Sequence, residues 1–125
     1  MLLLAVCTTA LAQTKIFYVK TVAAGSADGS SWTNASADLQ AMMDAAYADA
    51  ATDVQVWVAE GEYKPTAHPG TATAADGLTD HDKAFVLRPG VKVYGGFDNA
   101  LTGTAGSLTS RTFETTGSTT GIFHT

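Results

Sequence analysis

Three short runs decide how this sequence folds: VQVWVAEGEYKP (54–65), AFVLRPG (84–90) and VKVYGGF (91–97). Each run is rich in Val, Phe, Tyr or Trp and is bounded by Gly or Pro, which is the composition of short β-strands. In the first run valine takes every second position from Val54 to Val58. Because alternate residues of a strand point to opposite faces, this run predicts a strand with one valine face.

The two later runs predict strands at 84–87 and 91–94 with a sharp bend between them. Arg88-Pro89-Gly90 supplies the bend, since Pro presets one turn dihedral and Gly tolerates the other. Gly95-Gly96 is expected to end the second of these strands. Earlier in the chain, KIFYVK (15–20) predicts a first strand, which is apolar and aromatic in the middle and charged at both ends.

The segment between the first strand and Val54 has the period of a helix. Apolar side chains follow the spacing i, i+3, i+4, i+7, i+8, i+11 at Leu39, Met42, Met43, Ala46, Tyr47 and Ala50. This spacing predicts an amphipathic α-helix near 35–51. Asn34 or Ser36 can cap its start, because a side-chain oxygen there accepts free backbone N–H groups of the first turn.

The first twelve residues, MLLLAVCTTALA, carry no charge and predict a secretion signal at 1–12. Ala10-Leu11-Ala12 has the small–x–small pattern that a signal peptidase reads, which places cleavage before Gln13. A buried N-terminal strand or helix is the alternative; the stretch is too short to span a bilayer, which needs about 20 apolar residues. Cleavage would remove Cys7, the one cysteine of the chain. The mature chain could then form no disulfide and could not use a thiol for catalysis. We therefore expect a secreted or cell-surface protein.

The charge of the chain argues against two classes of partner. Its formal net charge is −5 at pH 7, and its Lys and Arg residues are scattered. Such a chain lacks the basic patch that nucleic acid requires and the polybasic stretch that anionic lipid attracts. Neither nucleic acid nor a membrane is an expected partner.

No motif predicts catalysis, a metal or a cofactor. Glu60 and Glu62 flank a turn glycine at a strand end, where carboxylates are usually solvated. The acidic cluster at 76–82 lacks the spacing of a calcium loop. The histidines lack zinc spacing, and no serine lies in a G-x-S-x-G elbow.

Aromatic side chains are the candidates for binding a ligand. Trp57, Tyr63 and Tyr94 could stack on sugar rings, and they are the predicted carbohydrate-binding residues. Trp57 and Tyr94 lie on strands, opposite the valines. Packing in the interior is the alternative for all three, and the sequence favours it. For Trp32, packing between the turn and the helix is the favoured role.

The strands can be joined in two ways. They can form hairpins in a sandwich, although a two-residue Asn-Gly or Asp-Gly loop is absent. They can instead climb as coils of a solenoid, with strands of neighbouring coils stacked about 4.8 Å apart. One coil cannot bury its faces alone, and a helix before the first coil would serve as an end cap. Periodicity does not separate these two arrangements.

Particular residues add a family resemblance. In the right order, three segments resemble the N-terminal end of secreted bacterial proteins with a right-handed parallel β-helix, pectate-lyase-like chains that carry polymorphic outer membrane protein repeats. The matching residues are Tyr18-Val19, DGSSW (28–32), Asn34-Ala35 and Leu39-Gln40; then WVA (57–59), Gly61, Tyr63 and Pro65; then Phe85, Leu87, Gly90-Val91 and YGGF (94–97).

The resemblance covers about residues 15–98 and implies a mostly β fold, the capped start of a right-handed single-stranded parallel β-helix. The implied organisation is a signal peptide at 1–12, a strand, loop and capping helix at 13–53, the first coils at 54–114, and a disordered or truncated tail at 115–125. The catalytic residues of lyases in this family have no matching position here, so none is carried over.

Three functions follow as hypotheses. The first is a non-catalytic segment of a secreted or cell-surface protein with a structural, adhesion or display role. The second is the N-terminal part of a polysaccharide lyase or hydrolase whose catalytic coils lie beyond residue 125, and the third is a carbohydrate-binding module. The expected partners are a polysaccharide or a surface ligand. An unfinished coil would also expose a strand edge for end-to-end self-association.

Overall fold

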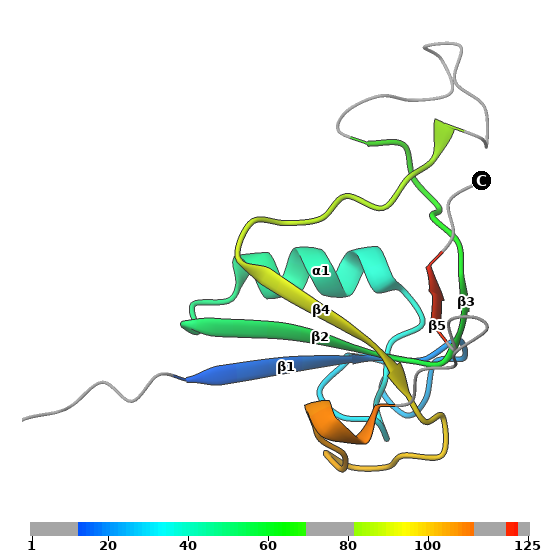
Figure 1. The fold of residues 1–125 in the computed structure, drawn as a ribbon. Helices are drawn as coiled ribbons and strands as arrows, with labels where there is room; N and C mark the ends of the chain where they lie inside the picture. Colours follow the sequence, from blue (N-terminus) through cyan, green and yellow to red (C-terminus); the bar gives the residue numbers. More distant parts are fainter. Residues whose placement is uncertain (1–12, 70–81, 112–119, 123–125) are drawn as a thin grey trace, which may run out of the picture.

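The computed structural model describes residues 13–69, 82–111 and 120–122, and its fold is mostly β with one α-helix (Figure 1). The elements in chain order are β1 (Thr14–Val19), α1 (Leu39–Ala48), β2 (Asp53–Ala59), β3 (Gly61–Tyr63), β4 (Val91–Phe97), the 3-10 turn η3 (Leu108–Ser110) and β5 (Thr120–Ile122).

All pairings among the described strands are parallel. β1, β2 and β4 form one sheet in the order β1–β2–β4, and β3 and β5 form a second, smaller sheet. A parallel pair needs a long crossover connection, whereas a hairpin gives an antiparallel pair. The hairpin alternative is therefore wrong for these strands.

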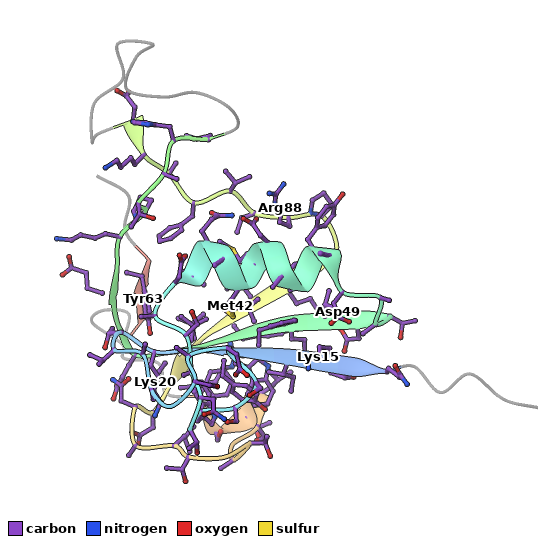
Figure 2. All side chains as sticks on the ribbon, turned by 180° about the vertical axis from the view of Figure 1, so that it is seen from behind. Lys15, Lys20, Met42, Asp49, Tyr63 and Arg88 are labelled. Atoms are coloured by element: carbon purple, nitrogen blue, oxygen red, sulfur yellow. The ribbon has the colours of Figure 1, made fainter. Side chains whose placement is uncertain are left out.

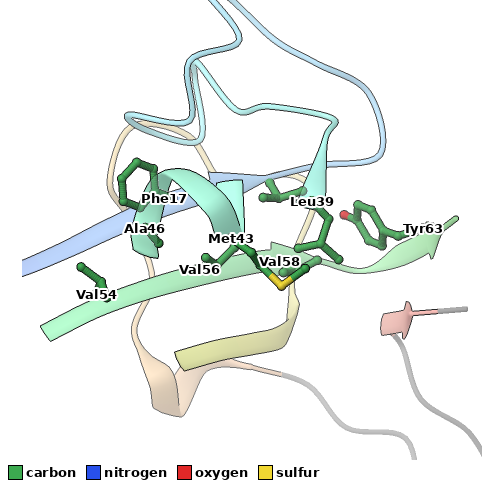
Figure 3. Close-up of a cluster of buried hydrophobic side chains, with 9 residues drawn as sticks. Phe17, Leu39, Met43, Ala46, Val54, Val56, Val58 and Tyr63 are labelled. Carbon is green, nitrogen blue, oxygen red and sulfur yellow. The ribbon is translucent and has the colours of Figure 1, made fainter. Parts of the chain in front are cut away.

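The predicted valine face of β2 is present, and it packs under α1. Phe17, Val56 and Val93 are register partners across the sheet, so apolar side chains line up in rows. This cluster contains Phe17, Val19, Leu39, Met43, Ala46, Val54, Val56, Val58 and Tyr63. Figure 3 shows Met43 of α1 beside Val56 and Val58 of β2. Burying one such side chain stabilises the fold by roughly 1.5–3 kcal/mol.

α1 starts later and ends earlier than predicted. Its N-cap is Asp38, whose carboxylate accepts a hydrogen bond from the Ala41 N–H at 2.9 Å. Ser36, one of the two predicted caps, is instead drawn into the sheet as the bridge partner of Val19. The other, Asn34, accepts a hydrogen bond from the Ser26 N–H through its side chain. At the far end Asp49 is extended, which ends the helix.

The strand predicted at 84–87 does not form. A side chain, rather than a neighbouring strand, makes the hydrogen bonds to its main chain. The Gln40 Oε1 accepts from the Val86 N–H at 2.8 Å, and the Gln40 Nε2 donates to the Val86 carbonyl at 3.1 Å. Arg88 Nε also donates to Asp44 Oδ1 at 2.7 Å, and the guanidinium lies over the Tyr47 ring. Residues 84–88 are thus fastened to α1, with Arg88 beside the helix (Figure 2).

β4 continues through the two glycines that were expected to end it. Trp57 pairs with Tyr94 but Ala59 pairs with Phe97, so Gly95 and Gly96 together face one residue of β2. This is a β-bulge, and Gly96 has a φ of 85°, a left-handed conformation that favours glycine. The extra residue turns Phe97 away from the valine face and onto the opposite one.

That opposite face holds an aromatic cluster under two loop segments, 20–36 and 98–111. Trp57 and Phe97 are stacked with ring centroids 4.6 Å apart, and Trp32 lies 5.4 Å from Phe97. Tyr18 meets Trp32 edge-on at 4.9 Å. The Trp32 indole N–H donates to the Ala105 carbonyl, so this fully buried ring joins the two segments.

Several sequence predictions fall on residues outside the described ranges. These are the signal peptide at 1–12, the acidic cluster except Asp82, and most of the tail at 115–125. β5 lies within that tail and pairs with β3. Among the described residues, no helix is both long and apolar enough to span a membrane.

We predict that Gln40→Met releases Val86 from α1 while keeping the side-chain volume; Arg88 still holds the end of the segment through Asp44. Three hydrogen bonds are lost, two neutral ones to Val86 and one to the Asp44 carboxylate, so the free energy of unfolding should fall by about 2–3 kcal/mol. Hydrogen exchange at the Val86 amide should accelerate. Gln13→Met, which changes an exposed residue before β1, is the control. Unchanged exchange at Val86 would show that Gln40 does not hold this segment.

Candidate functional site

A cleft of about 520 Å³ opens at the N-terminal end of α1. Four segments that are far apart in the sequence form its walls, and we call it the α1 cleft. Its lining residues are Thr21, Ala23, Ala27, Ser36, Ala37, Asp38, Leu39, Gln40, Glu62, Tyr63, Lys64, Thr66 and Phe85.

Apolar side chains give the cleft a largely hydrophobic wall. Leu39 and Tyr63 are buried members of the valine-face cluster, and Phe85 packs against the same cluster. The Tyr63 hydroxyl donates to the Ala59 carbonyl at 2.7 Å, so its polar end is already bonded. Burial raises the pKa of Tyr63 because the phenolate would lose its hydration. This tyrosine therefore contributes a neutral ring to the cleft.

Charged and hydroxyl groups complete the cleft. The exposed Asp38 carboxylate caps α1 through Ala41, and the Ser36 hydroxyl oxygen accepts from the Asp38 N–H at 3.0 Å. Glu62 and Lys64 form an exposed ion pair at 2.9 Å. The arrangement offers carboxylate and hydroxyl oxygens beside apolar walls, which is the composition of a small-molecule site.

The three predicted carbohydrate-binding residues lie in two different places. Tyr63 lines the α1 cleft, whereas Trp57 and Tyr94 belong to the aromatic face on the other side of the sheet. Trp57 is only 6% exposed and is covered by the stacked Phe97. Tyr94 is half-buried, with the Arg111 guanidinium over its ring. The three rings therefore do not form one common surface, and their binding of sugars stays a prediction.

A polar network lies at the N-terminal ends of the three strands of the larger sheet. Asp53 accepts hydrogen bonds from Lys92, Gln55 and Thr14, and so it joins all three strands of the larger sheet. The bond from Lys92, followed by that from Gln55, lowers the pKa of Asp53. Gln55 in turn accepts from the Trp57 indole N–H at 2.8 Å. The network orients Trp57 and connects strands; its groups are bonded to one another.

The carboxylates that flank Gly61 have separate surroundings. Glu62 is exposed and paired with Lys64, while the Glu60 main chain bonds to Phe97 and to the Asn99 side chain. In the ranges that the structure describes, no group of three His, Cys, Asp or Glu side chains could hold a metal ion.

Sequence reasoning did not predict the α1 cleft. Its residues come from the first loop, the start of α1, β3 and the segment before β4, and no local motif marks them as a set. One signal was available: Asp38 directly precedes the first apolar residue of the helical period, which is the position of an N-cap.

Comparisons of the chain with protein-family models, with curated proteins and with solved structures found no match.

We predict that Tyr63→Phe changes stability in a pH-dependent way. Below pH 10 the variant should lose about 1 kcal/mol, because the hydrogen bond to Ala59 is removed. The ordinary tyrosine pKa is 10.0, and the folded chain raises it. Above pH 10 the unfolded state therefore releases a proton that the folded state retains, and the wild-type protein loses stability.

The phenylalanine in Tyr63→Phe has no group to ionise, so the variant does not lose stability at this position as the pH rises. The stability curves of wild type and variant should therefore converge. Urea unfolding at a series of pH values measures both effects. Tyr47→Phe, at an exposed tyrosine, is the matched control. Parallel curves for wild type and Tyr63→Phe would contradict a neutral, buried Tyr63.

Proposed function

We propose that this chain is the closed starting end of a secreted or cell-surface parallel β-helix. Its role is structural, in adhesion or display, and this segment carries no catalysis. The resemblance in residues 15–98 supports this reading, and so does the way in which successive passes of the chain are stacked.

The stacking of two passes is the observation that carries the proposed architecture. One pass runs along β2 and turns at Glu60 into β3; the next runs along β4 and later into β5. β4 lies parallel to β2, and β5 lies parallel to β3. Repeated strand–corner–strand passes in register are what a solenoid needs, because each coil buries its faces only against its neighbours.

The two edges of the larger sheet differ in a way that suits one closed end. On β1, the Tyr18 N–H donates to the Gly29 carbonyl, and the Lys20 N–H donates to the Ser36 carbonyl. The chain's own loop therefore covers the C-terminal end of this edge, at residues 18–20. On β4, residues 92–94 make no main-chain hydrogen bond outside their pairing with β2 in the described part of the chain. We therefore expect a further parallel strand to add at β4, where none of these three residues is covered by the loop.

The covered edge also explains the place of α1. The helix follows directly from the loop that closes β1, and it packs on the face formed by β1, β2 and β4. In a solenoid this helix fills the start of the interior, where no earlier coil exists to supply side chains. A protein built in this way presents an extended, rigid scaffold, which fits display or adhesion.

We predict that the β4 edge is the site of end-to-end association. In amide hydrogen exchange at low protein concentration, the outward N–H groups among residues 92–94 should exchange fast. Raising the concentration should protect them as strands from other copies pair there. The Tyr18 and Lys20 amides, which are already bonded at the β1 edge, are the internal control. Exchange at β4 that is independent of concentration would contradict an open edge.

Secretion is tested through residues 1–12. We predict that a bacterium expressing the whole reading frame exports the chain and that N-terminal sequencing of the exported form begins at Gln13. Leu4→Arg places a charge in the apolar stretch and should retain the chain inside the cell. Thr8→Ser, which keeps the stretch uncharged, is the control. A full-length chain that remains in the cytoplasm would contradict a secretion signal.

A further inference from the structure

The α1 cleft has the size of a ligand site and does not depend on the open β4 edge. Its volume is about 520 Å³, within the range of roughly 300–1,000 Å³ that is common for small-molecule sites. We propose that the α1 cleft binds a small organic cation, a molecule with an ammonium group on an apolar body.

The charges of the lining favour a cation over an anion. Glu62 and Lys64 are paired with each other at 2.9 Å, so their charges largely cancel. Asp38 remains as the unbalanced charge of the lining. A helix N-terminus attracts anions when it is free, but here the Asp38 carboxylate already occupies that position. A second anion would meet this carboxylate, whereas an ammonium group would neutralise it.

Two acceptor groups in the cleft have capacity left for a donor. One Asp38 oxygen accepts from the Ala41 N–H, and among residues 13–69, 82–111 and 120–122 no hydrogen bond to the other oxygen is found. Ser36 is only 6% exposed, and in the part of the chain that the structure describes its hydroxyl oxygen accepts one hydrogen bond, from the Asp38 N–H. A hydroxyl oxygen accepts through two lone pairs. An ammonium group has three N–H donors and no acceptor, so it suits this pair of oxygens.

The rest of the lining accounts for the apolar body. Leu39, Tyr63 and Phe85 present carbon surface, and the Tyr63 hydroxyl is bonded to Ala59 rather than free to bind a polar ligand. The Gln40 amide is likewise bonded to Val86 on both its oxygen and its nitrogen. The walls therefore favour a ring or chain of carbon next to the acceptors at the start of α1. The net charge of −5 adds attraction for a cation at long range.

Phenethylamine is a suitable probe, because it joins an aromatic ring to an ammonium group. In ¹H–¹⁵N NMR titrations of the full chain at neutral pH, it should shift the amides of residues 36–41 and 62–64 in a saturable way. 2-Phenylethanol has nearly the same shape without the charge, and 3-phenylpropanoate carries the opposite charge. The first should bind roughly tenfold more weakly than the amine, since it lacks a charged hydrogen bond, and the second should show no saturable binding.

Three variants locate the charge that matters. Asp38→Asn keeps an equally good N-cap but removes the carboxylate charge, and it should weaken phenethylamine binding roughly tenfold. Lys64→Gln should strengthen it, because a competing cation is removed. Asp49→Asn removes the same charge at the other end of α1, about 16 Å away at 1.5 Å per residue, and should leave the affinity unchanged.

Several results would overturn the proposal. Equal affinity for the amine and the alcohol would show that charge plays no part. Preferential binding of 3-phenylpropanoate, or weaker amine binding in Lys64→Gln, would make the cleft an anion site. Saturable binding of cellobiose at the same amides, with no response to the amine, would make it a site for neutral polyols. Because Lys64→Gln is predicted to act in the opposite direction to Asp38→Asn, a general loss of folding cannot imitate the expected pattern.

Discussion

The whole structure depends on β2, the strand that is paired on both edges and buried on both faces. Residues 54–59 are all buried, and β1 and β4 pair with β2 on opposite sides. Its valines supply the surface that α1 covers, while Trp57 supplies the centre of the aromatic face. A parallel strand covered on both faces reads as an almost continuous apolar run. This is why VQVWVA, rather than any charged motif, determines the fold.

The strands and the helix that follow one clear period could be predicted from the sequence. Lys15–Lys20, Val54–Ala59 and the helix at Leu39 were found because their apolar spacing reflects contacts within a single element. The strand predicted at 84–87 failed for the opposite reason. Its β-like composition is real, but the Gln40 amide supplies the hydrogen bonds that a neighbouring strand would otherwise make. Local propensity cannot reveal a side chain that lies 46 residues away in the sequence.

The site was harder to predict than the fold. Trp57, Tyr63 and Tyr94 were singled out for their chemistry, but the bulge at Gly95-Gly96 places Phe97 over Trp57, and only Tyr63 lines the α1 cleft. A bulge changes which face a side chain occupies without changing the composition of its strand. The cleft itself is assembled from four segments, so its carboxylate, hydroxyl and aromatic groups become neighbours only when the sheet has formed.

The loop that closes β1 is held in place by residues that come after β4. Lys20 Nζ donates to the carbonyls of Asn99 and Leu101, and the main-chain N–H of Trp32 donates to the Gly103 carbonyl. The covered edge therefore depends on contacts with residues about 80 positions further along the chain. Such long-range contacts form late, since the entropy of closing a long loop must be overcome first. The closed edge at β1 and the edge at β4 are consequently parts of one cooperative unit. The loop at β1 is held in place only when β4 and the residues that follow it have been added to the sheet.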